Sequence, residues 1–166
     1  IINEWVAIIV DVKGAFLTAS LGGADKYIYM EIPEGWEHLF EGDVVLRLKK
    51  TVYGAQQSTK RCWISVLMVM DAMEFQRSKM DPCLYYKWDA NGLCIIMSFV
   101  DDMYIGGTRA AAMDAKEKFM SHFSCDDVGD ANEYIGNKVT RVDGTMKLTQ
   151  PMLLQSFRDE FELPNE

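Results

Sequence analysis

Two adjacent carboxylates interrupt an apolar stretch of this chain, which is an unusual setting for charge. Residues 93–100 carry no charged side chain and have the length of a buried strand, and residues 103–105 resume the apolar pattern after Asp101 and Asp102. The pattern predicts a hairpin whose tight turn carries both Asp residues. Because Asp side chains hydrogen-bond local backbone, a solvated turn is the simplest interpretation of this pair taken alone.

Two other features decide how much weight the pair deserves. Asp126 and Asp127 form a second pair in what reads as a polar loop without apolar arms, so an Asp pair by itself is weak evidence. Asp11 strengthens the functional interpretation of Asp101 and Asp102 because it has a similar setting. It directly follows residues 5–10, another apolar run with the pattern of a buried strand. An Asp at a strand end is often only a turn or cap residue. In an antiparallel sheet, however, Asp11 and Asp101 could converge on one edge.

Such a cluster of carboxylates would require a cation. Like charges repel and an unpaired charge near a core is costly. An oxygen-only ligand set without His or Cys favours Mg²⁺ or Mn²⁺ over zinc. Two such ions about 3.5–4 Å apart serve phosphoryl transfer by activating the attacking oxygen and stabilising the leaving one. The acidic residues therefore indicate polymerase-type chemistry.

Composition limits the classes to which the chain can belong. Its 166 residues are 49% apolar and 25% charged, which suits one domain with a substantial core. The four cysteines form no Cys-x-x-Cys pair and the two histidines are far apart, so we expect no structural zinc or disulfides and a reducing compartment. No apolar run approaches 18 residues and no signal-peptide pattern is seen, so we expect no membrane partner. The net charge of −8 argues against binding nucleic acid by bulk electrostatics.

The remaining pattern predicts the elements that would position the carboxylates. Asn91-Gly92 and Asp143-Gly144 are strong hairpin signals, Thr108 can cap a helix, and Pro151 fits the first turn of another. The predicted elements are strands at 5–10, 27–32 (half-buried, from its alternation), 44–48, 83–88, 93–100, 134–139 and 145–148, and helices at 59–75, after Thr108 and after Pro151. We therefore expect an α+β domain with a mostly antiparallel sheet packed on helices.

A series of motifs in fixed order resembles the reverse transcriptase of copia-type LTR retrotransposons along nearly the whole chain. Any one motif is weak, but their order and spacing are specific. The motifs are Asp11-Val-Lys-Gly-Ala-Phe16, Ile28-Tyr-Met-Glu-Ile-Pro-Glu-Gly-Trp36, Val52-Tyr-Gly-Ala-Gln-Gln57, Asp81-Pro82-Cys83, Phe99-Val-Asp-Asp102, Asp127-Val-Gly-Asp-Ala-Asn-Glu-Tyr-Ile-Gly136 and Leu148-Thr-Gln150.

The resemblance implies a fold, an activity and partners. Residues 1–130 would be a right-hand polymerase palm whose fingers lie upstream, and residues 131–166 a primer-grip-like hairpin with the beginning of a thumb. The activity would be RNA-directed DNA synthesis from dNTPs with two Mg²⁺ ions (or Mn²⁺), on an RNA template with a DNA primer. The chain, which opens on Ile1 rather than Met, would be a fragment of a Pol polyprotein that also holds fingers, ribonuclease H and integrase for DNA integration. It would act in cytoplasmic virus-like particles or in the nucleus.

The resemblance also implies roles for individual residues. The catalytic residues would be Asp11, Asp101 and Asp102, and the metal ligands Asp11, the Val12 carbonyl, Asp101 and, less directly, Asp102. Phe16 would be the aromatic gate that selects deoxynucleotides, with Gln57 and Lys13 also binding the nucleotide. Primer-binding residues would be Val100, Tyr134, Ile135 and Gly136.

The chain departs from the family pattern, and two other functions remain open. The segment from Gln57 to Trp63 is one residue longer than the family's Gln-Ala-Pro-Arg-Ala-Trp and lacks its proline. Because the fingers that hold the triphosphate are missing, we expect the 166 residues alone to polymerise little or nothing. A non-catalytic retroelement relic is one alternative, although all three Asp residues are intact. A palm-type nucleotidyl cyclase is another, but it would not explain Phe16 or the ordered motifs.

Overall fold

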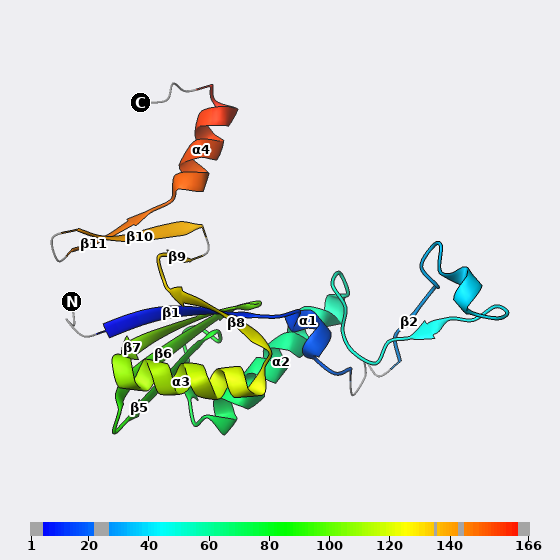
Figure 1. Ribbon diagram of the computed structural model, residues 1–166, viewed down its shortest axis with the longest axis horizontal. Coiled ribbons are helices and arrows are strands. Elements are labelled where there is room, and N and C mark those ends of the chain that lie inside the picture. Colours follow the sequence, from blue (N-terminus) through cyan, green and yellow to red (C-terminus); the bar gives the residue numbers. More distant parts are fainter. Residues whose placement is uncertain (1–4, 22–26, 135, 143–144, 163–166) are drawn as a thin grey trace.

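One large antiparallel sheet organises the molecule, and two long helices lie over it (Figure 1). The computed structural model describes residues 5–21, 27–134, 136–142 and 145–162. The strand order in the sheet is β4-β5-β6-β7-β1-β8, with every neighbouring pair antiparallel. The six strands are β1 (Trp5–Val12), β4 (Gln76–Arg77), β5 (Leu84–Asp89), β6 (Gly92–Phe99), β7 (Asp102–Thr108) and β8 (Cys125–Asp130). The predicted mixed fold with an antiparallel sheet packed on helices is confirmed.

The core lies between one face of this sheet and helices α2 (Gln56–Ala72) and α3 (Arg109–His122). Side chains alternate along each central strand, so Ile8, Val10 and Val12 of β1 face the helices while Asp11 lies on the other face. The centre of the core is fully buried and apolar: Val10, Met70, Tyr85, Ile96, Met103, Ile105, Ala112 and Phe119. This packing fixes which face of the sheet each carboxylate occupies.

The two predicted helices that cover the sheet both form, with small differences at their ends. The predicted helix at 59–75 begins three residues earlier, and the helix after Thr108 follows as expected. Thr108 occupies the N-cap position but its hydroxyl makes no cap hydrogen bond; it donates instead to the Asn91 carbonyl at 2.6 Å. Thr108 therefore ties the start of α3 to the β5–β6 hairpin. None of the helices in the described part of the chain is long and apolar enough to span a membrane.

The acidic segment after α3 was wrongly predicted as a polar loop. It forms the edge strand β8, which pairs with β1 and has an irregularity in register beside Ile9 and Val10. Lys116 on α3 binds the Asp127 carboxylate at 2.6 Å and lowers the pKa of that carboxyl. The ion pair and the solvent-exposed edge together explain how an acidic segment forms a strand here.

A ribbon of two short strands, β2 (Tyr29–Met30) and β3 (Leu46–Arg47), extends away from the sheet and carries the short 3-10 helix η2 (Glu37–Leu39) (Figure 1). The predicted strand at 27–32 was expected to be half-buried. The apolar side is only partly covered: Ile28 and Ile32 are half-buried as expected, but Met30 of β2 is 37% exposed. The prediction is therefore wrong at Met30.

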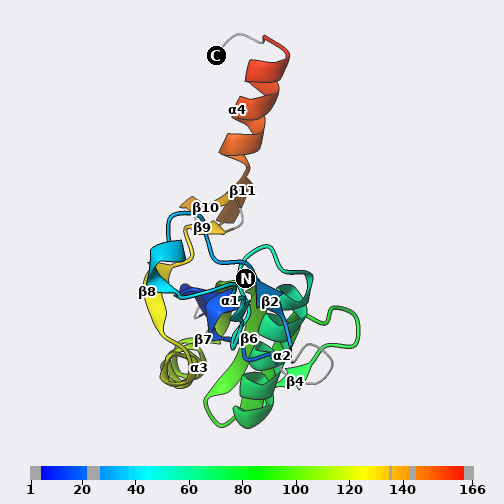
Figure 2. The same ribbon diagram turned by 90° about the vertical axis from the view of Figure 1, so that its right-hand side faces the viewer.

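The C-terminal elements form a separate three-stranded sheet, in the order β11-β10-β9, followed by helix α4 (Pro151–Glu160) with Pro151 in its first turn as predicted. Its strands are β9 (Glu133–Tyr134), β10 (Asn137–Val142) and β11 (Thr145–Thr149), and the predicted turn at Asp143-Gly144 lies outside the described residues. Figure 2 shows α4 projecting away from the main sheet. The apolar face of α4, with Leu153, Leu154 and Phe157, is exposed.

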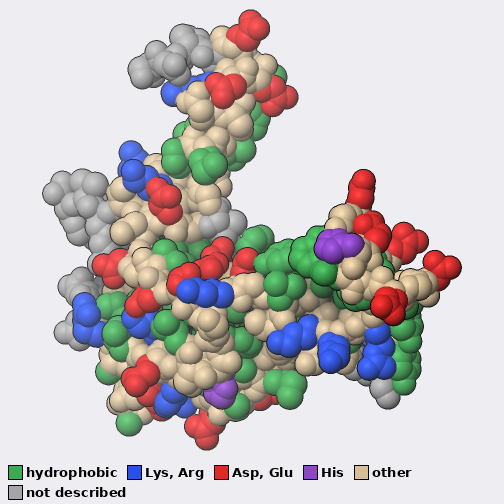
Figure 3. Space-filling view, turned by 45° about the vertical axis from the view of Figure 1, so that its right-hand side comes forward, with side chains coloured by type: hydrophobic (Ala, Val, Ile, Leu, Met, Phe, Trp, Pro, Cys, Tyr) green, Lys and Arg blue, Asp and Glu red, His purple; other side chains and the backbone are tan. Residues whose placement is uncertain are grey.

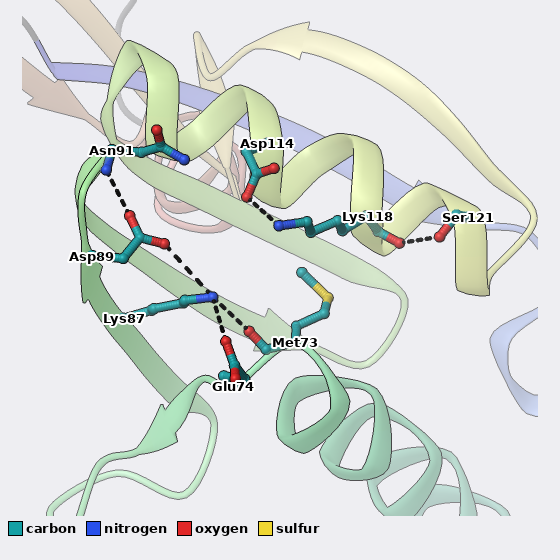
Figure 4. A network of polar contacts seen from close by, with 8 residues as sticks. All are labelled: Met73, Glu74, Lys87, Asp89, Asn91, Asp114, Lys118 and Ser121. Carbon is teal, nitrogen blue, oxygen red and sulfur yellow. Dashed lines mark hydrogen bonds and ion pairs between the residues drawn. The ribbon is translucent and has the colours of Figure 1, made fainter.

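A polar network joins the elements at the end of the sheet where the β5–β6 hairpin turns (Figure 4). Lys87 on β5 donates to the Met73 carbonyl at 3.1 Å and forms ion pairs with Glu74 and Asp89. The Asn91 amide donates to Asp89 at 2.8 Å within the predicted turn. Every carboxylate of this network shown in Figure 4 faces a cation or a backbone donor. In this respect they differ from Asp101 and Asp102, which lie at the other end of β6.

Candidate active site

The sheet register places two of the predicted catalytic carboxylates directly side by side. Asp11 of β1 pairs with Asp102 of β7, and the Val12 amide donates to the Asp101 carbonyl at 2.8 Å. Asp11 and Asp102 therefore form a non-hydrogen-bonded pair on one face, in which Cβ atoms are typically about 4.5–5.5 Å apart. The structure thus brings together Asp11, Asp101 and Asp102 at one end of β1 and β7, although Asp11 lies within its strand and not beyond its end.

The third carboxylate is held in a strained two-residue turn. Phe99 pairs with Asp102, so the turn between β6 and β7 consists of Val100 and Asp101, one residue earlier than predicted. Val100 has φ 57°, a left-handed conformation that is unfavourable for a β-branched residue. Its carbonyl accepts a weak hydrogen bond from the Cys62 thiol at 3.9 Å, and its side chain lines an apolar cavity of about 290 Å³ behind the turn. Strain of this kind persists only where the surrounding structure imposes it.

Replacement of Val100 with Gly is expected to raise the free energy of unfolding by about 1 kcal/mol. Relief of the left-handed strain (roughly 1–3 kcal/mol) outweighs the added chain entropy of Gly (roughly 0.5–1 kcal/mol). Denaturant unfolding measures the change. Val45, an exposed valine that is not among the residues with positive φ, is the matched control: Val45→Gly should be neutral or destabilising. Destabilisation of both variants alike would contradict the assigned strain.

The electrostatics of the site follow from these positions. Burial raises the pKa of the Asp102 carboxyl, and the negative charges of Asp101 and Asp11 raise it further. In the part of the chain that the structure describes, no ion pair involves these three carboxylates. Lys13 feels the negative charge of Asp11, but its ion pair is with Asp126.

Replacement of Asp102 with Asn should stabilise the fold at neutral pH. The pKa of the Asp102 carboxyl is higher in the folded state than in the unfolded state, so the folded protein binds the Asp102 proton more tightly. The free energy of unfolding therefore falls as the pH rises from the unfolded-state pKa to the folded-state pKa. The expected gain at pH 7 is about 0.2–1 kcal/mol, the size of one opposed like-charge pair, and it should vanish below about pH 4. Unfolding at pH 7 and pH 3.5 tests this, with exposed Glu117→Gln as control. An equal gain at both pH values would contradict it.

The donor set suits a hard divalent cation in kind, since it consists of carboxylate oxygens whose repulsion a cation would relieve. As the side chains stand, no group of three or more His, Cys, Asp or Glu among the described residues is close enough together to hold a metal ion. The charges of Asp11 and Asp101 nevertheless raise the pKa of Asp102, and the register of β1 and β7 places the backbones of Asp11 and Asp102 side by side. The oxygen ligands are therefore of the kind that Mg²⁺ prefers, but the described side chains as placed do not form a metal site.

A fourth carboxylate escaped sequence reasoning. Asp126 of β8 lies opposite Asp11 on the other side of β1, so Asp11 stands between Asp102 and Asp126. Lys13 forms an ion pair with Asp126 at 2.6 Å, and this hydrogen bond is the main reason that the pKa of Lys13 is raised. Lys13, predicted to bind nucleotide, is thus engaged by Asp126.

Phe16, the predicted gate residue, lies five residues after Asp11 in the sequence. Phe16 is in the short helix α1 (Ala15–Thr18), and its ring makes an edge contact with Tyr53 at 5.0 Å between centroids. The Thr51 hydroxyl donates to the Phe16 carbonyl. Helix α1 packs against α2, whose first turn carries the half-buried Gln57. Tyr53 therefore holds the ring of Phe16, and Thr51 holds its backbone.

Two of the predicted primer-binding residues, Tyr134 and Gly136, lie at the junction between the two sheets. Tyr134 contacts the Tyr104 ring at 5.4 Å and its hydroxyl donates to the Met97 carbonyl at 3.5 Å. Burial, reinforced by the charge of Asp102, raises the pKa of Tyr134 to about 12. Gly136 has φ 72° in the turn that follows, while Ile135 lies outside the described residues. Tyr134 thus fastens the C-terminal sheet beside the carboxylates.

Comparisons with known proteins agree with these features. Residues 1–166 match the family model described as reverse transcriptase (RNA-dependent DNA polymerase). The chain is 30% identical over 159 residues to the retrovirus-related Pol polyprotein from transposon TNT 1-94 of Nicotiana tabacum, covering 93% of this chain and 12% of that protein. It is 25% and 23% identical to the corresponding polyproteins of transposons RE2 and RE1 of Arabidopsis thaliana, covering 89% of this chain and 10% of each. The resemblance predicted from the motifs is confirmed: the chain belongs to the reverse transcriptase (RNA-dependent DNA polymerase) family.

Proposed function

We propose that this chain forms the catalytic centre of an RNA-directed DNA polymerase that transfers nucleotides from dNTPs to a primer 3′-hydroxyl. The observation that carries the proposal is the register that sets Asp11 beside Asp102, with Asp101 in the adjoining strained turn. In this assignment the main sheet with α2 and α3 is a polymerase palm, and residues 131–166 begin the thumb.

The roles of the residues follow from their chemistry. Asp11 and Asp101, with the Val12 carbonyl, would hold two Mg²⁺ ions, and Asp102 would supply further negative charge beside them. When bound, the ions activate the attacking hydroxyl and stabilise the leaving oxygen. Phe16 would limit the space at the incoming sugar, Gln57 would contact the nucleotide, and Val100 would face the primer terminus.

The longer polyprotein is part of the proposal. The chain spans only 10–12% of the length of the curated relatives it matches. Within the described residues, the cation nearest in sequence to Asp11, Lys13, is held by Asp126. We propose that adjoining Pol segments supply the cations that hold the triphosphate, together with ribonuclease H and integrase activities in the same virus-like particle.

Primer extension on an RNA template tests the function. The 166-residue chain alone is expected to extend a DNA primer little or not at all, whereas the chain joined to its adjoining Pol segments should extend it with Mg²⁺ and stop when the ion is chelated. Robust extension by the chain alone would refute the dependence on other segments. No extension by the longer protein with either Mg²⁺ or Mn²⁺ would favour a non-catalytic relic.

A further inference from the structure

The apolar cavity of about 290 Å³ behind the β6–β7 turn is not lined by any acidic residue of the described chain. Its walls come from elements far apart in the sequence. The residues that line it from α1, α2 and the turn are Phe16, Cys62, Trp63, Val66 and Val100. Cys62 and Val66 belong to the core on the helix side of the main sheet, whereas Asp11 lies on the opposite face. The cavity therefore belongs to the core side of the sheet and not to the carboxylate cluster.

Tyr85 of β5 brings a buried hydroxyl to this cavity. The side chain is fully buried, and within the part of the chain that the structure describes its hydroxyl is the only buried side-chain polar group that makes no hydrogen bond. Burial raises the pKa of Tyr85, and the side chains of Ser98 and Trp63 are near enough to the hydroxyl to lower it. Ser98 and Trp63 both line the cavity. The Tyr85 hydroxyl therefore lies beside it.

The polar groups near the Tyr85 hydroxyl do not satisfy it. The Ser98 amide and hydroxyl both donate to the Cys83 carbonyl, at 2.9 and 3.4 Å. The indole N–H of Trp63 can only donate. The Tyr85 proton thus has no acceptor in place, and a buried hydroxyl in that condition costs free energy that a suitable ligand would recover.

Water is a poor occupant of this cavity. A buried water needs roughly two to four polar partners, whereas apolar cavities of about 150 Å³ stay dry and bind benzene. The walls here are mainly apolar, and the volume of about 290 Å³ has room for two fused rings. A planar bicyclic molecule with one acceptor atom would fill the space and accept a hydrogen bond from the Tyr85 hydroxyl.

The charge of the protein restricts the occupant further. The chain carries a formal net charge of −8, and Figure 3 shows Asp and Glu side chains on every lobe of the face it draws. No Lys or Arg of the described residues lines the cavity. An anionic ligand, a nucleotide included, would lack a counter-charge there, so a neutral ligand is favoured.

We propose that this cavity is a binding site for a neutral heteroaromatic molecule of two fused rings, whose ring nitrogen accepts a hydrogen bond from the Tyr85 hydroxyl. The rings pack against the apolar side chains of α1 and α2. Val100 forms part of the wall, so an occupant also packs against the strained turn that carries Asp101. The inference goes beyond the proposed polymerase function and does not rest on it, because it needs only the cavity and the hydroxyl.

Quinoline and naphthalene are matched probes, since they share a shape and only quinoline carries an acceptor. The rise in melting temperature of the 166-residue chain with probe concentration, at a pH where quinoline is neutral, measures binding to the folded protein. Tyr85→Phe should weaken quinoline binding about fivefold, the effect of one lost hydrogen bond, and leave naphthalene binding unchanged. Tyr86→Phe, at the neighbouring 40% exposed tyrosine, is the matched control and should bind both probes as the wild type does.

A cavity-filling variant locates the probes. Val66→Phe, which extends a buried wall residue of α2 into the cavity, should bind neither probe. Unchanged binding in this variant would place the probes elsewhere and overturn the proposal. The Tyr85→Phe comparison decides the matter by itself if Val66→Phe does not fold, because Phe keeps the ring and removes only the unpaired hydroxyl.

The outcomes are independent of the proposed function. A selective loss of quinoline binding in Tyr85→Phe supports the proposal. Equal effects on the two probes, an unchanged quinoline affinity, or no stabilisation of the wild type by either probe overturns it. None of these measurements involves primer extension, so failure of extension by the longer protein would count against the polymerase alone, and failure of probe binding against the cavity alone.

Discussion

Asp101→Asn is expected to reduce primer extension by the longer protein about 10³-fold. The change removes one negative charge from the site proposed to hold both metal ions, and the loss corresponds to about 4 kcal/mol of transition-state stabilisation. Asn preserves the volume of the side chain, and the backbone contact from the Val12 amide to the residue 101 carbonyl is retained. Single-turnover extension at saturating dNTP measures the chemical step, and the melting temperature should change little.

Asp126→Asn is the matched control for this prediction. Asp126 lies opposite Asp11 on the same sheet, but its charge is already paired with Lys13. We expect less than a tenfold change in extension, because Asp126 is not among the proposed ligands. If Asp126→Asn abolished extension while Asp101→Asn retained it, the metal site would have to be reassigned to Asp11 and Asp126.

The difference between these two residues shows what the sequence could predict of the site. Asp101 and Asp102 stand out because apolar arms flank them, and Asp11 because it falls within an apolar strand. Asp126 has no such signal: β8 is an edge strand, so its residues need not be apolar, and two lysines offset its charges. Its place beside Asp11 depends on pairing between strands more than 100 residues apart, which a local pattern does not encode.

Local sequence patterns also gave wrong predictions for features that depend on tertiary structure, namely the position of the β6–β7 turn and the exposure of residues 27–32. The turn was predicted one residue late because Asp is a common turn residue, whereas the structure places β-branched Val100 at positive φ. The alternation at 27–32 predicted a strand but not its exposure, since periodicity does not reveal whether another layer covers the strand. Helix predictions succeeded where apolar periodicity determines the local structure. The hairpin predicted from Asn91-Gly92 also forms, but its two turn residues are Ala90 and Asn91, because Asp89 pairs with Gly92.

Gly107→Ala is expected to destabilise the fold by at least about 3 kcal/mol, a large part of the roughly 5–15 kcal/mol typical of a domain. The apolar pattern predicted from the sequence covers only residues 103–105, but β7 continues through Gly106 and Gly107 to Thr108. Gly107 pairs with Cys94 at a place where a Cβ atom would lie 2.2 Å from the Leu93 carbonyl oxygen and 2.9 Å from the Cys94 Cα. Both obstacles are backbone, so β6 and β7 would have to separate.

Gly106→Ala is the matched control one residue away. There an added Cβ would lie 3.0 Å from the ring of Tyr104, a side chain that can move. We expect a loss of about 1 kcal/mol or less in denaturant unfolding, against the much larger loss for Gly107→Ala. Equal losses would show that β6 and β7 do not approach as closely as the structure has them. Because these strands carry the Val100-Asp101 turn at their other end, Gly107→Ala should also lower primer extension in the protein that remains folded, and by more than Gly106→Ala, which displaces only the Tyr104 side chain.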